Sequence, residues 1–251
     1  MNDAAPTDAG AVTAAADAAT TLTQLDDAVT FCRACPRLVA WREQVATERR
    51  AAFRDEEYWG RPVPGFGPAD ARVVVLGLAP AAHGANRTGR VFTGDRSGDW
   101  LFSALHRAGL ANQPSARARD DGLVLTGTRV LAAVRCAPPE NKPTTTERDI
   151  CSAWMDREMD LLRAQMRVVV ALGGFAWQAA LSWHLRTGGD LARPRPRFGH
   201  GATARLGDVV LLGCYHPSQQ NTFTGRLTEQ MLDGVLQAAV EHAWPQGTME
   251  P

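Results

Sequence analysis

The residue with the clearest potential for chemistry is a histidine placed just beyond the last apolar run of the chain. His216 follows Val209–Leu212, and Pro217 restricts the backbone beside it. A short apolar run bounded by glycine predicts a buried strand. Open α/β sheets bind ligands beyond the carboxyl ends of their strands, so His216 occupies a position typical of a catalyst. A His-Pro pair alone is weak evidence, and its weight depends on the other strand ends.

The cysteines form a second set of residues that could do chemistry. Cys32 and Cys35 make a C-x-x-C pair in a helical segment, far along the chain from Cys136 and Cys151. A zinc ribbon would usually show a second close pair, whereas four thiolates from distant segments can hold a [4Fe–4S] cluster. The spacing leaves zinc, a cluster and plain buried thiols open. Cys214, at the end of an apolar run, is expected to be a core thiol.

Strand and helix patterns alternate along the chain. The apolar runs that predict strands are Val73–Leu78, Val130–Val134, Val168–Leu172 and Val209–Leu212. Helices are expected at 22–50 as an entry unit, and then at Trp100–Ala108, Glu147–Arg163, Phe175–Leu185 and Leu227–His242. Thr144 and Glu147 form a capping box for the second of these later helices. The alternation predicts an α/β fold with a central parallel four-stranded sheet covered on both faces.

Glycine and proline are frequent just after each expected strand. The segments concerned are 77–84, 136–143, 173–175 and 215–218. These residues favour tight loops that let a ligand approach the backbone closely. A single site built from several of these loops is therefore expected.

Composition limits the classes of protein that the chain can belong to. It has 251 residues, 45% of them hydrophobic and 22% charged, which is typical of a globular protein. No apolar stretch is long enough to cross a membrane, and the first residues lack the pattern of a secretory signal, so a cytoplasmic protein is expected. Residues 1–21 are expected to be a flexible tail, because their Ala/Thr/Asp composition is unsuited to a core, and 246–251 a flexible C-terminus.

Charge is balanced overall but uneven locally. The formal net charge is zero, so any affinity for nucleic acid must come from local patches. One excess of arginine consists of Arg186, Arg193, Arg195, Arg197 and Arg205, with only Asp190 and Asp208 nearby. This segment is either a solvated loop or a surface that contacts phosphates.

Together these motifs resemble the family 5, or type B, uracil-DNA glycosylases. The resemblance rests on the long segment 77–90, on 92–95 with its Gly-Asp ending, on His216-Pro217-Ser218 with Asn221, and on four of the cysteines. It covers nearly everything after the first 21 residues. It implies a three-layer α/β/α fold and excision of uracil and related deaminated bases from double-stranded DNA. One glycosylase domain over 22–245, acting as a monomer, is expected. It also implies that Cys32, Cys35, Cys136 and Cys151 hold a [4Fe–4S] cluster.

The resemblance assigns roles to individual residues. His216 is expected to donate a hydrogen bond to the departing base, and Asp95 to hold or activate water and to stabilise the sugar cation. A helix cap is the structural alternative for Asp95. Phe92 is expected to stack on the extruded base. Gly77, Ala79, Asn141 and Ser218 are further expected in substrate binding, and Asn221 and Arg226 in DNA binding.

The loop after the first strand carries alanines where better-known uracil-DNA glycosylases carry a polar catalytic residue. Ala79, Ala81 and Ala82 place fewer hydrogen-bonding demands on a base, so broad specificity that includes hypoxanthine or xanthine is expected. Two alternatives remain at this stage. One is a mismatch-directed thymine glycosylase, and the other is a non-catalytic iron–sulfur module that binds nucleic acid. The second would not need the pairing of Asp95 with His216.

Overall fold

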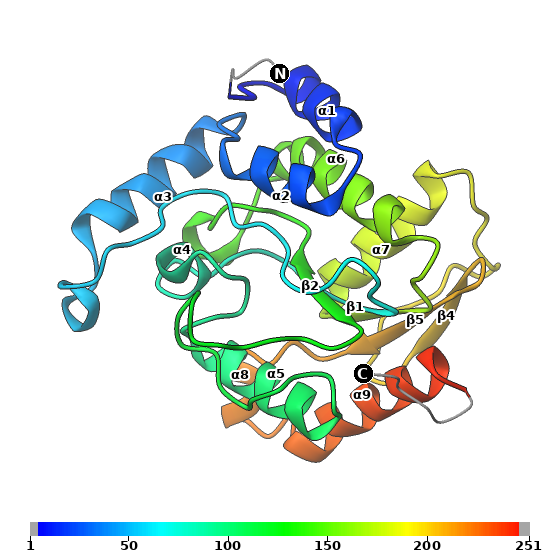
Figure 1. Ribbon diagram of the computed structural model, residues 1–251. Helices are drawn as coiled ribbons and strands as arrows, with labels where there is room; N and C mark the ends of the chain where they lie inside the picture. Colours follow the sequence, from blue (N-terminus) through cyan, green and yellow to red (C-terminus); the bar gives the residue numbers. More distant parts are fainter. Residues whose placement is uncertain (1–4, 246–251) are drawn as a thin grey trace.

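A twisted sheet runs through the centre of the computed structural model, which describes residues 5–245 (Figure 1). Its strands are β1 (Val73–Gly77), β2 (Thr128–Ala132), β3 (Val168–Leu172), β4 (Thr203–Leu206) and β5 (Val209–Cys214). They lie in the order β2-β1-β3-β5-β4. The four strands expected from the apolar runs are parallel to one another, which confirms the parallel sheet.

Helices cover both faces of this sheet, as the alternation predicts. The α-helices are α1 (Ala9–Ala18), α2 (Leu22–Thr30), α3 (Pro36–Glu48), α4 (Ala85–Thr88), α5 (Arg96–Arg107), α6 (Thr145–Leu162), α7 (Gly174–Arg186), α8 (Gln219–Phe223) and α9 (Glu229–Ala243). Short 3₁₀ turns lie at Ala51–Phe53 and Pro139–Asn141. Figure 1 shows α1, α2, α6 and α7 on one side of the sheet and α5 and α9 on the other. The three-layer α/β/α prediction is confirmed.

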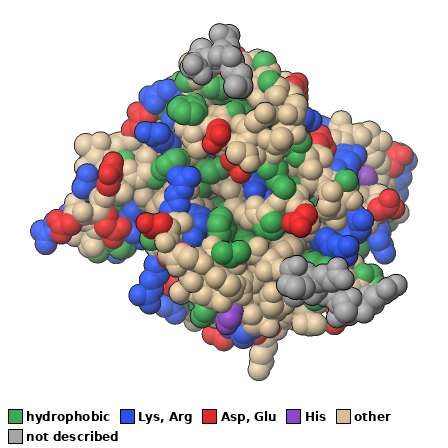
Figure 2. Space-filling view, viewed as in Figure 1, with side chains coloured by type: hydrophobic (Ala, Val, Ile, Leu, Met, Phe, Trp, Pro, Cys, Tyr) green, Lys and Arg blue, Asp and Glu red, His purple; other side chains and the backbone are tan. Residues whose placement is uncertain are grey.

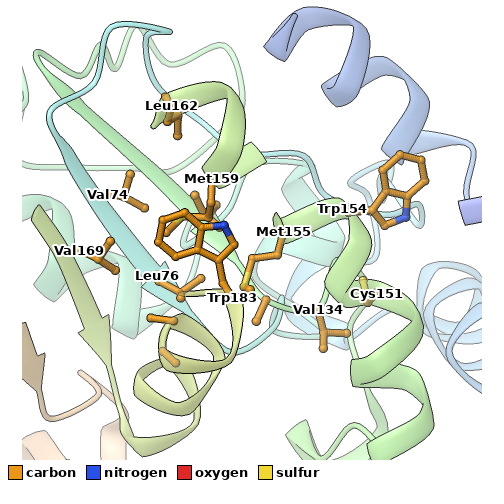
Figure 3. Packing of buried hydrophobic residues seen from close by; sticks show 14 of the residues in the cluster. Val74, Leu76, Val134, Cys151, Trp154, Met155, Met159, Leu162, Val169 and Trp183 are labelled. Carbon is orange, nitrogen blue, oxygen red and sulfur yellow. The ribbon is translucent and has the colours of Figure 1, made fainter. Parts of the chain in front are cut away.

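Alternate residues of each central strand enter opposite cores, because successive side chains of a strand point to opposite faces. On β1, Val74 and Leu76 pack toward α6 and α7, whereas Val73 and Val75 pack toward α5 and α9. Figure 3 shows the first core: Met155, Met159 and Leu162 of α6 lie near Val74, Leu76 and Val169, with Trp183 of α7 beside them. The sheet is thus buried on both faces, and its strand ends are fixed in position.

The sheet has five strands rather than the four expected. The extra strand β4 runs antiparallel to β5 at the edge of the sheet. Its residues alternate between exposed and buried, as is usual for an edge strand with one solvated face. Four alternating residues give no continuous apolar run, which explains why the sequence pattern missed it.

Much of the segment expected as a flexible tail is a packed helix. Helix α1 is capped by Asp8, whose side chain accepts a hydrogen bond from the Ala11 backbone N–H. Val12 and Ala16 are buried, and α1 lies against α6. Small side chains let the two helices approach closely, so an alanine-rich segment contributes to the core without a strongly apolar pattern. The expected flexible C-terminus at 246–251 lies outside the described residues.

The start of α6 agrees with the sequence pattern. The capping box of α6 is present, with the Thr144 hydroxyl and the Glu147 carboxylate each accepting a hydrogen bond from the other residue's backbone N–H.

Between residues 5 and 245, no helix is both long and apolar enough to cross a bilayer. Figure 2 shows acidic and basic side chains interspersed on the face in view, in keeping with the net charge of zero.

Candidate active site

Loops that follow β1, β2 and β5 meet at one pocket of about 510 Å³. Its lining residues are Leu78, Ala79, Pro80, Ala81, Phe92, Asp95, Arg96, Ser97, Asn141, His216, Ser218, Gln219 and Gln220. The two residues expected to be catalytic, Asp95 and His216, thus share a pocket although they are far apart in the sequence. Ala79, Phe92, Asn141 and Ser218, expected in substrate binding, line the same space. The pocket lies at the carboxyl ends of the parallel strands, where open α/β sheets bind ligands.

His216 contributes a neutral imidazole to this pocket. Burial lowers the pKa of its ring to about 4, so the ring is uncharged at neutral pH. Its centroid lies 5.8 Å from that of the Phe92 ring. Two hydrogen bonds order the loop that carries His216. The Asn221 side-chain amide donates to the His216 carbonyl oxygen at 2.9 Å, and the Ser218 hydroxyl accepts from the Asn221 backbone N–H at 3.4 Å. These bonds order the backbone of the His216 loop, and the neutral imidazole can act as a hydrogen-bond donor without carrying a charge.

Phe92 and Gly77 form one packing unit at the back of the pocket. A Cβ atom at Gly77 would lie 2.7 Å from the Phe92 ring, so only glycine lets the ring pack over the end of β1. Gly77 itself does not line the pocket, and its part is to make room for the aromatic ring. Phe92 has φ of 52°, a left-handed conformation that costs on the order of 1–3 kcal/mol for such a residue. Strain of this kind is retained where the ring position matters.

Asp95 both caps a helix and faces the pocket, so the two roles considered for it are compatible. One carboxylate oxygen accepts a hydrogen bond from the Gly98 backbone N–H at 3.0 Å and caps α5. The other lies against Gly84, where any Cβ atom would collide with it. Burial raises the pKa of this carboxyl, while the backbone N–H groups of Gly98 and Ser97 oppose the rise. The cap fixes the direction of a carboxylate that burial has made more basic.

Arg87 is a buried residue of the site that the sequence patterns did not single out. Its guanidinium donates to the Gly94 carbonyl oxygen and, through Nε, to the His83 carbonyl oxygen, each at 2.9 Å. It also pairs with Glu56 and lies 3.9 Å from the centre of the Phe53 ring. Arg87 thus ties the segment before the first strand to the turn that carries Asp95. The contacts with Glu56 and Phe53 span about 30 residues of sequence, so no local pattern could reveal them.

A second, wider pocket of about 840 Å³ adjoins the first. The two share Asp95 and Asn141, together with Ala81, Arg96 and Gln219. Asn141 is exposed and has φ of 57°, next to Glu140 at 54°. Asn141 thus brings the loop after β2 to both pockets.

The structure places the two residues expected to bind DNA outside the pocket. Asn221 orders the His216 loop, as described above, and exposed Arg226 lies 4.7 Å from the centre of the Tyr215 ring. Other lining residues were not anticipated: Arg96, Gln219 and Gln220. Each lies beside the Gly-Asp or His-Pro-Ser motif in the sequence, so adjacency to these motifs was the available signal.

Four of the cysteines line a separate cavity. Cys32 and Cys35 come from the connection between α2 and α3, Cys136 follows β2, and Cys151 lies on α6. Cys151 is seen beside the core in Figure 3. Burial raises the pKa of Cys136 to about 11 and raises that of Cys151 as well, so both are neutral thiols unless they bind a metal. Within 5–245, no three ligand side chains converge as they would around a single metal ion.

Two arginines donate hydrogen bonds to sulfur atoms of this cavity. The Arg42 guanidinium donates to the Cys136 sulfur at 2.9 Å and to the Cys32 carbonyl oxygen at 3.1 Å. The backbone N–H of Arg135 donates to the Cys151 sulfur at 3.2 Å. Arg42 is 2% exposed, and its Nε has no hydrogen-bond partner among the described residues. A buried cation that faces sulfur in this way favours an anionic thiolate. Cys214 is buried elsewhere, at the end of β5, as expected.

Comparison with known proteins agrees with this geometry. The model of the uracil DNA glycosylase superfamily matches residues 64–240. That range contains Asp95, His216, Cys136 and Cys151, and it begins after Cys32 and Cys35.

Curated relatives extend the similarity over most of the chain. A type-5 uracil-DNA glycosylase of Mycobacterium bovis is 57% identical over 225 residues, which is 89% of this chain and 82% of the relative. The protein of the same name from Mycobacterium leprae is 57% identical over 217 residues, 86% of this chain and 93% of the relative. That of Thermus thermophilus is 52% identical over 212 residues, 84% and 93% of the two chains. With the pocket, its two catalytic candidates and these relatives in agreement, the chain belongs to the type-5 uracil-DNA glycosylases, within the uracil DNA glycosylase superfamily.

Proposed function

We propose that this protein hydrolyses the N-glycosidic bond between uracil and deoxyribose in DNA and leaves an abasic site. The observation that carries the proposal is the shared pocket, in which a carboxylate and a neutral imidazole accompany an aromatic ring. The relatives' name supports uracil as the substrate. An abasic product places the enzyme at the start of base excision repair.

His216 is proposed to assist the leaving group. When the bond between C1′ and the base nitrogen breaks, its electron pair leaves with the base, and negative charge develops on the base oxygens. A hydrogen bond donated from the neutral ring of His216 stabilises that charge. A neutral donor suits the task because it remains a donor across the neutral pH range. Phe92, next to the imidazole, is proposed to stack on the base.

Asp95 is proposed to serve the sugar side of the reaction. The carboxylate stabilises positive charge on the sugar and accepts a proton from the attacking water, whose oxygen forms the new bond to C1′. The released base takes up a proton, so atoms and charge balance. The raised pKa makes Asp95 a better proton acceptor than an ordinary carboxylate, and the Gly98 hydrogen bond fixes its direction.

The base-binding part of the pocket is proposed to accept several deaminated bases. Leu78, Ala79, Pro80 and Ala81 line it with apolar side chains only. A wall that makes no side-chain hydrogen bonds with a base cannot reject another base for failing to form them. Hypoxanthine and xanthine are therefore proposed as further substrates.

The substrate is proposed to be double-stranded DNA from which the damaged nucleotide is rotated out of the stack. Catalysis on a base at the bottom of a pocket requires such extrusion. Arg226, exposed beside Tyr215, is proposed to contact the DNA backbone as the nucleotide leaves the duplex. Action as a monomer is part of the proposal.

The cysteine-lined cavity is proposed to hold a [4Fe–4S] cluster on Cys32, Cys35, Cys136 and Cys151. Four sulfur-bearing side chains on one cavity match the ligand number of such a cluster. The buried Arg42 guanidinium, which donates to the Cys136 sulfur, fits the negative charge of cluster-bound thiolates. The cluster would be structural, since it occupies a cavity separate from the Asp95 pocket. Iron and sulfide analysis of anaerobically purified protein tests this; stoichiometric zinc without iron would refute it.

Cleavage of duplex oligonucleotides tests the function. Each duplex carries uracil, hypoxanthine, xanthine or thymine opposite a defined base, and the abasic product is cleaved by alkali. The proposal expects release of uracil and of the deaminated purines, and a much slower release of each in Asp95→Asn. Strict uracil selectivity would refute the broad pocket, and a preference for mismatched thymine would favour the alternative glycosylase. No release of any base would favour a non-catalytic module.

A further inference from the structure

The arginine-rich stretch near the end of the chain separates into distinct positions in the structure. Arg186, on α7, pairs with Asp156 of α6 at 2.6 Å. Arg205, on β4, lies beside Val210 near the start of β5, away from the carboxyl ends of the strands. Arg193, Arg195 and Arg197 instead belong to the segment that precedes β4. In this segment, Pro196 contacts Trp177 of α7 and Phe198 contacts Tyr215, which precedes His216.

The segment that carries Arg195 and Arg197 is fixed to the carboxyl end of β5. The Trp177 indole N–H donates to the Pro196 carbonyl oxygen at 3.2 Å, and the Tyr215 backbone N–H donates to His200 Nδ1 at 3.3 Å. Backbone pairing continues past the strand, because the Gly201 N–H donates to the Gly213 carbonyl oxygen at 2.7 Å. Pro196 lies between the two arginines, so their backbone is held against α7.

Aromatic packing places this segment beside the catalytic loop. The Phe198 ring lies 6.2 Å from the Tyr215 ring, and Tyr215 directly precedes His216. Phe198 also packs close to Gly174 at the start of α7. Arg226 lies over the same Tyr215 ring. Tyr215 thus has contacts with both Arg226 and the arginine-bearing segment.

Both arginines are exposed, and neither has an acidic partner in the part of the chain that the structure describes. Arg195 donates to the neutral Gln178 side chain at 3.1 Å, and Arg197 makes no ion pair or side-chain hydrogen bond among residues 5–245. An arginine guanidinium presents a planar set of donors that matches the oxygens of a phosphate. Two unpaired guanidinium groups beside a nucleotide-extruding loop are therefore suited to a DNA backbone.

We propose that Arg195 and Arg197 bind DNA phosphates on one side of the extruded nucleotide and extend the interface over the start of α7. The proposal rests on the proposed function and adds the direction in which the duplex continues beyond the pocket. Arg186 and Arg205 take no part in it.

Salt dependence of binding tests the proposal. Affinity for a uracil-containing duplex is measured in the Asp95→Asn background, which prevents turnover, over a range of salt concentrations. A plot of log affinity against log salt concentration has a negative slope. Each phosphate that no longer has an arginine partner reduces the steepness of that slope by about 0.9. The double variant Arg195→Gln/Arg197→Gln should reduce the steepness of the slope by roughly 2 and weaken binding most at low salt. Arg205→Gln, the matched control from the same stretch, should leave the slope unchanged.

Shortened duplexes locate the phosphates that the two arginines bind. Removing base pairs from one arm should abolish the difference between the Asp95→Asn protein and its double variant, whereas shortening the other arm should preserve it. An unchanged slope in the double variant, or an equal change in Arg205→Gln, would overturn the proposal. Uracil release by the wild-type protein is assayed in parallel. Its absence would refute the proposed function separately from the binding result.

Discussion

The base pocket and the cysteine cavity both contain buried titratable groups, but the surroundings of these groups differ. In the pocket, His216 and Asp95 line about 510 Å³ of open space. In the cavity, the sulfurs of Cys136 and Cys151 accept hydrogen bonds from Arg42 and Arg135. The first arrangement leaves groups available to react, and the second holds groups ready to act as ligands.

Burial alone therefore does not identify a catalytic residue in this protein. It lowers the pKa of His216 and raises those of Asp95 and Cys136. The two regions differ in what surrounds the buried groups. His216 and Asp95 line an open pocket, whereas the sulfurs of Cys136 and Cys151 already accept hydrogen bonds. If this comparison holds, changes in the pocket affect rates, whereas changes in the cavity affect metal content and stability.

The largest effect on rate is expected from Asp95→Asn. Loss of the carboxylate removes both the proton acceptor and the charge opposite the sugar cation, so the single-turnover rate should fall by about 10²–10⁴-fold. Affinity for uracil-containing DNA should change little, because the shape is conserved and the amide oxygen can still cap α5. Because burial raises the pKa of Asp95, the wild-type rate should decline with acidification at a higher pH than for an ordinary carboxylate. Unchanged turnover would place the catalytic carboxylate elsewhere.

The next largest effect is expected on metal content and stability, from Cys136→Ser. This variant should lose iron and visible absorbance and become less stable by about 2 kcal/mol or more, a fall in Tm of roughly 4–8 °C for a domain of this size. Cys214→Ser is the matched control, since that thiol lies at the end of β5, outside the cavity. The control should retain its iron. Equal iron in the two variants would contradict the assignment of the cavity.

A smaller effect is expected on the pH dependence of stability. Burial depresses the pKa of His216 to about 4, whereas the unfolded chain protonates near 6.5, so the unfolded state binds more protons between these values. Wild-type stability should therefore rise with pH across this window, with a contribution from His216 of roughly 1–3 kcal/mol. His216→Gln should remove that contribution, as measured by denaturant unfolding at pH 4.5 and 7. The same pH dependence in both proteins would show that the imidazole is not buried in solution.

Much of the fold was predictable because its determinants are local. The valine-rich run at Val168–Leu172 has only one reasonable interpretation, and the capping box at Thr144 marks the start of α6. Strand β4 and helix α1 were missed for a shared reason. Neither has a strong apolar pattern, and each is stabilised mainly by the surface on which it packs.

The site was predictable in its principal residues and unpredictable in their supports. Asp95 and His216 follow recognisable strand ends and motifs, and the structure brings them together. The role of Arg87 depends on contacts with segments before the first strand and after α4. The division of the arginine-rich stretch likewise depends on the turn into β4, which separates Arg197 from Arg205. The closeness of Arg197 and Arg205 in the sequence gave no indication that they lie in different parts of the fold.

The most direct test of the central claim compares two leaving groups. Single-turnover rates are measured on uracil and 5-fluorouracil for the wild type, Asp95→Asn and His216→Ala. His216→Ala should lose about 3 kcal/mol of transition-state stabilisation on uracil, as for an oxyanion donor. That defect should shrink on 5-fluorouracil, which departs more easily, because a better leaving group needs less help from the imidazole. The Asp95→Asn defect should persist on both substrates, since the water and the sugar cation are common to them. Identical responses of the two variants to the leaving group would contradict the division of labour between Asp95 and His216.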